Sequence, residues 1–167
     1  MAVSTQTKLP DIGLGENDLR GVAQILNTLL SDEYVLYTKT RNYHWNVVGP
    51  QFHDLHAFFE KQYEELNEIV DEVAERARQL GAPALGTLRE FVDTARLSEH
   101  PGGCPEAMMM IANLLEDHAA VIRTLRVDLE TCADRYHDIG TNDFLTALME
   151  RHEKMAWMLR AFLERAN

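Results

Sequence analysis

Two histidines, His44 and His56, stand twelve residues apart on either side of the helix-breaking pair Gly49-Pro50. His44 belongs to the stretch YHWNVVGP, which ends one apolar helical pattern, and His56 lies near the start of the next. Imidazole is the commonest protein ligand for transition metals, and a sharp turn can bring two rings to one place. The pair therefore predicts half of a metal site.

A row of polar side chains continues from His56 along the helix predicted over residues 51–80. Its members recur at steps of three or four residues, which places them within about 100° of arc beside the apolar face. They are His56, Glu60, Glu64, Asn67, Asp71 and Glu75. Like charges at this spacing cost roughly a few tenths of a kcal/mol per pair unless cations or protons compensate, so the row favours iron, zinc or manganese. The alternative is a solvated helix face without a ligand.

The two ends of this polar row lie too far apart on one helix to bind the same metal ion. His56 and Asp71 stand 15 residues apart, about 22 Å at 1.5 Å per residue. Two copies of the helix could pack antiparallel about a two-fold axis near Glu64 or Glu65, so that His56 of one chain faces Asp71 and Glu75 of the other. None of the seven histidines follows a glutamate by three residues, as the ligands of a di-iron centre inside one bundle do. We therefore predict two equivalent sites between two chains.

Apolar periodicity predicts four long helices that position these residues. They cover residues 17–48, residues 51–80, a segment that starts at Pro105 and has apolar steps to Leu129, and a segment capped by Thr141 that reaches Phe162.

The connections predict how these helices are arranged. Short turns at residues 49–50 and 138–140 imply antiparallel neighbours. The long connection over residues 81–104, with a short helix at 88–95 inside it, lets the second and third long helices run parallel. The expected fold is all-α, a ferritin-like four-helix bundle with a short extra helix in the crossover.

Composition narrows the class of protein. The chain suffices for a single domain, predicted over residues 17–167 after a flexible tail over residues 1–16. No apolar run approaches the roughly 18 residues of a membrane span, and the N-terminus lacks a secretory signal pattern, so we expect a cytoplasmic protein. The net charge of −11 opposes direct binding to DNA.

Two stretches carry a family resemblance. They read YHWNVVGPQFHDLHAFFEKQYEELNEIVDEVAERARQLG, continuing into PALGT, and TNDFLTALMERHEKMAWMLRAFLE. In them the chain resembles the Dps family, the DNA-binding proteins from starved cells or mini-ferritins, over nearly its whole length from about residue 17. The resemblance implies a hollow dodecamer that oxidises Fe²⁺, preferentially with hydrogen peroxide rather than oxygen, stores Fe³⁺ mineral and protects DNA from oxidative damage.

The resemblance also implies which residues act. His44, His56 and Glu60 would be metal ligands from one subunit, and Asp71 and Glu75 ligands from its two-fold partner; Zn²⁺ could occupy the same site.

Two further roles concern single residues. By the resemblance, Asp143 would line an acidic entry pore on a three-fold axis, with Asp138 as a candidate neighbour. Trp45, beside His44, is a candidate radical trap, and its alternative role is that of an interface or core aromatic.

Two other functions stay open. One is a nucleoid-associated DNA-binding protein whose iron site is secondary. Lys8 is the one basic residue among residues 1–16, and this scarcity of positive charge favours iron oxidation instead. The other is a helical interaction module that uses residues 51–80 as a dimer surface without catalysis.

The remaining histidines are assigned other roles. His152 lies on an apolar stripe and is predicted to be a hydrogen-bonded core histidine. His118 and His137 lie among acidic residues and are predicted at the surface. His53, three residues before His56, is the closest competitor for a place at the metal.

Overall fold

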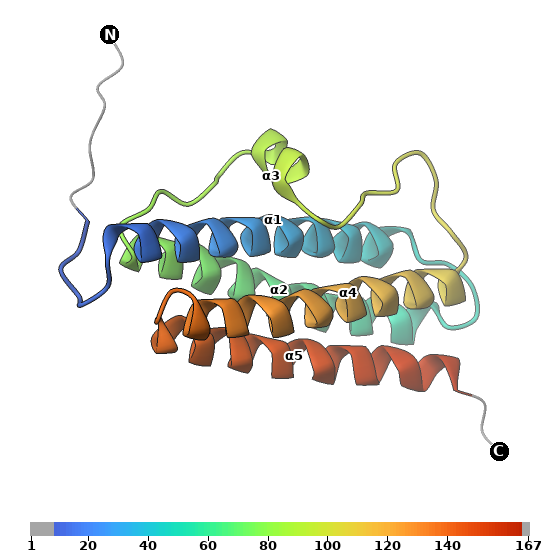
Figure 1. Cartoon of the computed structure of the whole chain (residues 1–167). Coiled ribbons are helices and arrows are strands. Elements are labelled where there is room, and N and C mark those ends of the chain that lie inside the picture. Colours follow the sequence, from blue (N-terminus) through green and yellow to red (C-terminus); the bar gives the residue numbers. More distant parts are fainter. Residues whose placement is uncertain (1–8, 165–167) are drawn as a thin grey trace, which may run out of the picture.

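The computed structural model describes residues 9–164, a range that contains five helices and no strand (Figure 1). The helices are α1 (Glu16–Asn46), α2 (Phe52–Gln79), α3 (Leu88–Thr94), α4 (Ala107–Asp134) and α5 (Ile139–Leu163). The predicted all-α fold is confirmed, and the predicted ends of the first three helices lie within two residues of those observed. In the described range, no helix has both the length and the apolar character needed to cross a membrane.

The four long helices form two antiparallel pairs, α1 with α2 and α4 with α5, that lie side by side (Figure 1). The turn after α1 reverses the chain at Gly49, whose φ of 108° is a conformation that residues with a side chain rarely adopt. The connection from α2 to α4 runs back along the bundle, and its short helix α3 packs against α1. This long crossover makes α2 and α4 parallel, as predicted.

The core consists of apolar stripes that each long helix turns inward. On α2 the stripe is narrow and contains Leu55, Phe59, Leu66, Ile69, Val73 and Ala77, with the polar Gln62 buried among them. Burial of a large apolar side chain stabilises the fold by about 1.5–3 kcal/mol, so this stripe fixes the rotation of α2 about its axis. Glu60, Asp71 and Glu75 consequently lie on the solvent side of the helix.

The segment before α1 also contacts the bundle. Leu9 and Leu14 pack against the core, and a side chain at Gly81 would meet Pro10 at 2.7 Å. The flexible tail remains a prediction for residues 1–8, which lie outside the described range.

Two predicted helix starts are wrong. α4 begins at Ala107, because Glu106 takes the extended N-cap position and leaves Pro105 outside the helix. α5 begins at Ile139, with Asp138 rather than Thr141 as its N-cap. The Asp138 carboxylate accepts hydrogen bonds from the Thr141 backbone N–H at 2.9 Å and from its hydroxyl at 2.5 Å. Because the Asp138 carboxylate accepts from the N–H three residues ahead, as an N-cap does, the helix starts before Thr141.

Replacing Asp138 by alanine is expected to lower the free energy of unfolding by about 1–2 kcal/mol, because the Thr141 N–H loses its acceptor. Denaturant unfolding at fixed protein concentration measures this loss. Asp138→Asn keeps an oxygen at the cap and is the matched control, expected close to the unaltered protein. Equal losses in both variants would show that the carboxylate acts in some way other than capping.

Candidate metal centre

His44 and His56 meet across the turn between α1 and α2. Their rings stack with centroids 3.8 Å apart and planes inclined by 19°. The Nδ1 of His44 lies 2.8 Å from the carbonyl oxygen of His56, and the Nδ1 of His56 lies 2.9 Å from the carbonyl oxygen of His44. A carbonyl oxygen only accepts hydrogen bonds, so each Nδ1 carries a proton and donates it. The Nε2 of each neutral ring is then a lone-pair donor suited to a metal ion.

Aromatic neighbours hold both rings in place. Phe52 stacks on His56 with centroids 5.1 Å apart, and Tyr63 meets the His44 ring edge-on at 5.2 Å. His44 is only 7% exposed, whereas His56 is half-buried. The pair is therefore fixed in orientation before a ligand binds.

Glu60 lies one turn beyond His56 on α2 and is exposed. The Tyr63 hydroxyl donates a hydrogen bond to its Oε1 at 3.3 Å. Burial, and after it the charge of Glu60, raise the pKa of Tyr63, so the phenol remains a donor at neutral pH. Sequence reasoning missed Tyr63, although its position three residues after Glu60 on the same helix is a usable signal.

Arg41 adds a positive charge one turn before His44. Its guanidinium carbon lies 5.1 Å from the centre of the Trp45 ring and 5.0 Å from that of Tyr63. It also donates a 2.6 Å hydrogen bond to the hydroxyl of Tyr37. Sequence reasoning missed Arg41 as well, although Tyr37 and Trp45 both stand four residues from it on α1.

Asp71 and Glu75 do not reach the histidines within one chain. Both are exposed on α2, nearer its C-terminal end. Asp71 borders a hollow beneath α3 with Tyr34 and Phe91. Within residues 9–164, no three His, Cys, Asp or Glu side chains of a single chain converge in an arrangement that could hold a metal ion.

The remaining histidines divide into exposed and buried. His53 is exposed and lies against Asp54, with Nδ1 3.4 Å from Oδ1, rather than with the stacked pair. His137 is exposed, as predicted, and the core position of His152 is confirmed. The prediction for His118 is wrong, because this residue is fully buried. Its acidic neighbours in sequence lie on other faces of α4, whereas Leu114, Val121 and Leu125 share its buried face.

The two aspartates considered for the pore differ in environment. Asp143 is exposed on α5. Asp138 is 4% exposed and occupied as a helix cap, with Arg76 Nη2 at 3.4 Å from its carboxylate. Because the Asp138 carboxylate already has these partners, the exposed Asp143 is the better candidate for contact with ions.

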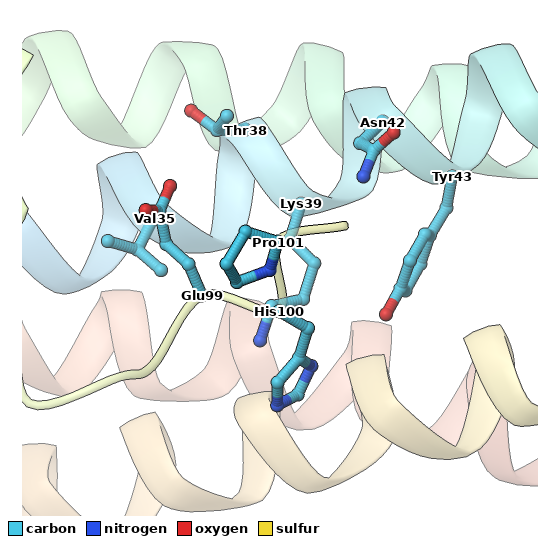
Figure 2. A pocket seen from close by; sticks show the side chains of 8 residues that line it. All are labelled: Val35, Thr38, Lys39, Asn42, Tyr43, Glu99, His100 and Pro101. Atoms are coloured by element: carbon cyan, nitrogen blue, oxygen red, sulfur yellow. The ribbon is translucent and has the colours of Figure 1, made fainter. Parts of the chain in front are cut away.

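A separate pocket of about 110 Å³ lies where the crossover meets α1 (Figure 2). Its lining includes Lys39, Glu99 and His100. The Lys39 ammonium donates hydrogen bonds to the Ser98 carbonyl at 2.9 Å and to the Asp117 carboxylate of α4 at 2.6 Å. Lys39 thus fastens the crossover to the bundle, and we assign it a structural role.

Comparison with known proteins places the chain in a family. A family model described as a ferritin-like domain matches residues 23–167. An uncharacterised low-temperature-induced protein of Nostoc sp. is 49% identical over 154 residues, which are 92% of this chain and 86% of the relative. A DNA protection during starvation protein of Brevibacillus brevis is 38% identical over 86% of this chain and 95% of its own length.

A solved structure agrees with these matches. It is a Dps protein from Vibrio cholerae, described as a member of a broad superfamily of ferritin-like diiron-carboxylate proteins. It superimposes with a TM-score of 0.87 and 32% identity, and the match covers 93% of this chain and 97% of the other.

Proposed function

Since the chain belongs to the Dps family of the ferritin-like superfamily, we propose that it oxidises Fe²⁺ at sites shared between two subunits and stores the Fe³⁺ product as mineral. The assembly would be a hollow homo-oligomer, for which the family resemblance implies a dodecamer. Removal of both Fe²⁺ and peroxide would protect DNA from oxidative damage.

The observation that carries this proposal is the reciprocal hydrogen bonding of His44 and His56. Two adjacent imidazoles, each with its proton committed to a backbone carbonyl, form a preorganised pair of nitrogen ligands. Glu60, one turn along α2 from His56 and hydrogen-bonded by Tyr63, would supply an oxygen ligand when a second subunit completes the site. Nitrogen and carboxylate ligands together suit Fe²⁺ and Zn²⁺.

The missing ligands would come from a second copy. The Asp71 and Glu75 carboxylates lie too far along α2 to join His56 in one chain, and an antiparallel α2 of a partner would bring them there. The apolar side chains of Val48 and Phe52, both exposed near the turn, fit burial against such a partner.

The ligand set also accounts for the proposed chemistry. Carboxylate oxygens stabilise Fe³⁺ more than Fe²⁺ and so favour loss of an electron. Two Fe²⁺ ions at one site give one electron each to the same hydrogen peroxide molecule. With two protons the products are two Fe³⁺ and two water molecules, so no hydroxyl radical is released. Oxygen is the alternative oxidant.

Trp45 is the proposed trap for an oxidising equivalent that escapes. It is 64% exposed, and the Arg41 guanidinium beside its ring opposes a positive charge on the indole. A trapped oxidation would therefore be held as the neutral indole radical, after loss of the N–H proton to solvent.

Charge favours the iron function over a DNA-binding function. A net charge of −11 per subunit attracts cations, and the exposed Asp143 is the residue proposed to line their entry pore. The same charge repels a polyphosphate, so direct DNA binding is not part of the proposal.

Zn²⁺ is expected to inhibit Fe²⁺ oxidation, because it binds nitrogen and oxygen ligands more tightly than Fe²⁺ and cannot be oxidised. Preloading with about two Zn²⁺ per subunit should lower the initial rate with hydrogen peroxide at least tenfold. Stopped-flow absorbance of Fe³⁺ measures the rate. Mg²⁺, which prefers all-oxygen ligands, is the control and should leave the rate unchanged. An unaltered rate with Zn²⁺ bound would contradict the proposed site.

A further inference from the structure

A carboxyl group and two imidazoles are buried together at the centre of the bundle, apart from the proposed metal site. They belong to Glu33 on α1, His118 on α4 and His152 on α5, and each residue has 0% exposure. The Nδ1 atoms of His118 and His152 lie 3.0 Å apart, within hydrogen-bonding distance. The Nε2 of His152 lies 3.0 Å from Oε1 of Glu33, at an angle outside that of a hydrogen bond, so this contact is electrostatic. The three side chains form a chain across three helices.

The order of protons along this chain follows from chemistry. One of the two facing Nδ1 atoms must donate and the other must accept. If Glu33 is ionised, a His152 that carries both ring protons balances its charge, because Nε2–H faces the carboxylate and Nδ1–H donates to Nδ1 of His118. His118, which accepts at Nδ1, then carries its own proton on Nε2, and that atom has no hydrogen-bond partner among the described residues.

Burial favours a state of this cluster that has no net charge. Glu33 has no other ion-pair partner within residues 9–164, and burial of an isolated charge is costly. The pair Glu33 and His152 can hold one shared proton with no net charge. A further proton on Nδ1 of His118 would break the hydrogen bond from His152 and leave an uncompensated positive charge in the core. The buried polar side chain of α2 is Gln62, which carries no charge and donates to the Met155 carbonyl of α5 at 3.3 Å.

We propose that Glu33, His118 and His152 form an acid-sensitive lock, which holds α1, α4 and α5 together at neutral pH and loosens them when a further proton enters. The lock is independent of the iron site, because none of its residues is a proposed ligand.

The direction of the pH dependence follows from His118. Burial, and after it the charge on His152, lower the pKa of His118 well below 6.5 in the folded protein. The unfolded chain takes up this proton at the ordinary value near 6.5, so it binds more protons than the folded chain below that pH. The stabilising contribution is therefore complete above about pH 6.5 and is lost as the pH falls toward the lowered pKa of the folded state.

The test measures the unfolding equilibrium constant of the full-length protein by chemical denaturation. The pH is varied from about 7.5 to about 5, a range that spans the ordinary His pKa of about 6.5. For one proton, the constant should rise about tenfold per pH unit in the acidic part of this range. His118→Gln removes the titrating ring and keeps a hydrogen-bonding side chain, so its slope should be lower by about one proton. The exposed His137, replaced by asparagine, is the control and should leave the slope unchanged.

Two outcomes would overturn the lock. The first is an equal slope for His118→Gln and the unaltered protein. The second is stabilisation by Zn²⁺ in a His44→Ala/His56→Ala background that disappears with His118→Gln, since this would identify a metal site instead. If His118→Gln does not fold, the variant Glu33→Leu/His118→Leu/His152→Leu replaces the whole cluster by apolar groups, and its slope should fall in the same way.

Discussion

Replacing His44 and His56 together by alanine is expected to lower the initial rate of peroxide-dependent Fe²⁺ oxidation by about 100-fold or more. The two rings are the only nitrogen ligands in the proposed site, and their loss leaves Glu60 with no partner ligand from its own chain. Removal of residues that merely orient a metal ligand already costs about 10- to 100-fold, so loss of two ligands should cost at least the upper value. Stopped-flow measurement of Fe³⁺ formation with hydrogen peroxide gives the rate.

A loss of rate identifies the ligands only if the protein still assembles. Analytical ultracentrifugation should give the same sedimentation coefficient for the double variant and the unaltered protein. His53→Ala is the matched control, because this exposed ring lies three residues from His56 and faces Asp54. An unchanged rate in the double variant would support a helical interaction module without catalysis.

Mixing two inactive variants is expected to restore about one quarter of the unaltered activity. One variant is His44→Ala/His56→Ala, and the other is Asp71→Asn/Glu75→Gln. In a two-fold pair of unlike chains, one site receives both sets of altered ligands and the other receives both intact sets. With equal amounts and random pairing, half of the pairs are mixed and half of their sites are intact, which gives about one quarter.

Co-expression with two different affinity tags and purification through both tags would yield the mixed assemblies, and the tag selection would set the exact fraction expected. Each variant assembled alone is the control and should be inactive. If both variants are inactive alone and the mixed assembly is also inactive, the ligands do not come from two chains. Activity of Asp71→Asn/Glu75→Gln alone would show that the acidic pair is not needed.

Local pattern was sufficient to predict the helices and their topology. The apolar stripe of α2, from Leu55 to Ala77, repeats at helical intervals, and burial of such a stripe outweighs the weak preferences of single residues. The lengths of the connections then determined the topology. Gly49-Pro50 is long enough only for a hairpin between antiparallel helices, whereas residues 81–104 are long enough to run back along the bundle. The start of α5 was harder, because Asp138 and Thr141 both have side chains that cap helices, and only the hydrogen bonds distinguish them.

For the candidate site, the sequence determined which residue types were available and at what spacing along α2. It could not determine how the rings of His44 and His56 are oriented, since each is fixed by a carbonyl of the other helix. Tyr63 and Arg41 also make contacts within their own helices, which spacing could have indicated, whereas their contacts with each other and with the His44 ring cross from one helix to the next.

The buried histidines show this division most clearly. Sequence alone determined that His152 lies on an apolar stripe, because that depends on spacing within one helix. Only the tertiary structure decided that His118 lies beside it and that Glu33 completes the cluster, because burial depends on which faces of three separate helices meet. Periodicity is a property of one helix, whereas the electrostatic environment of a side chain is set by all the helices that surround it.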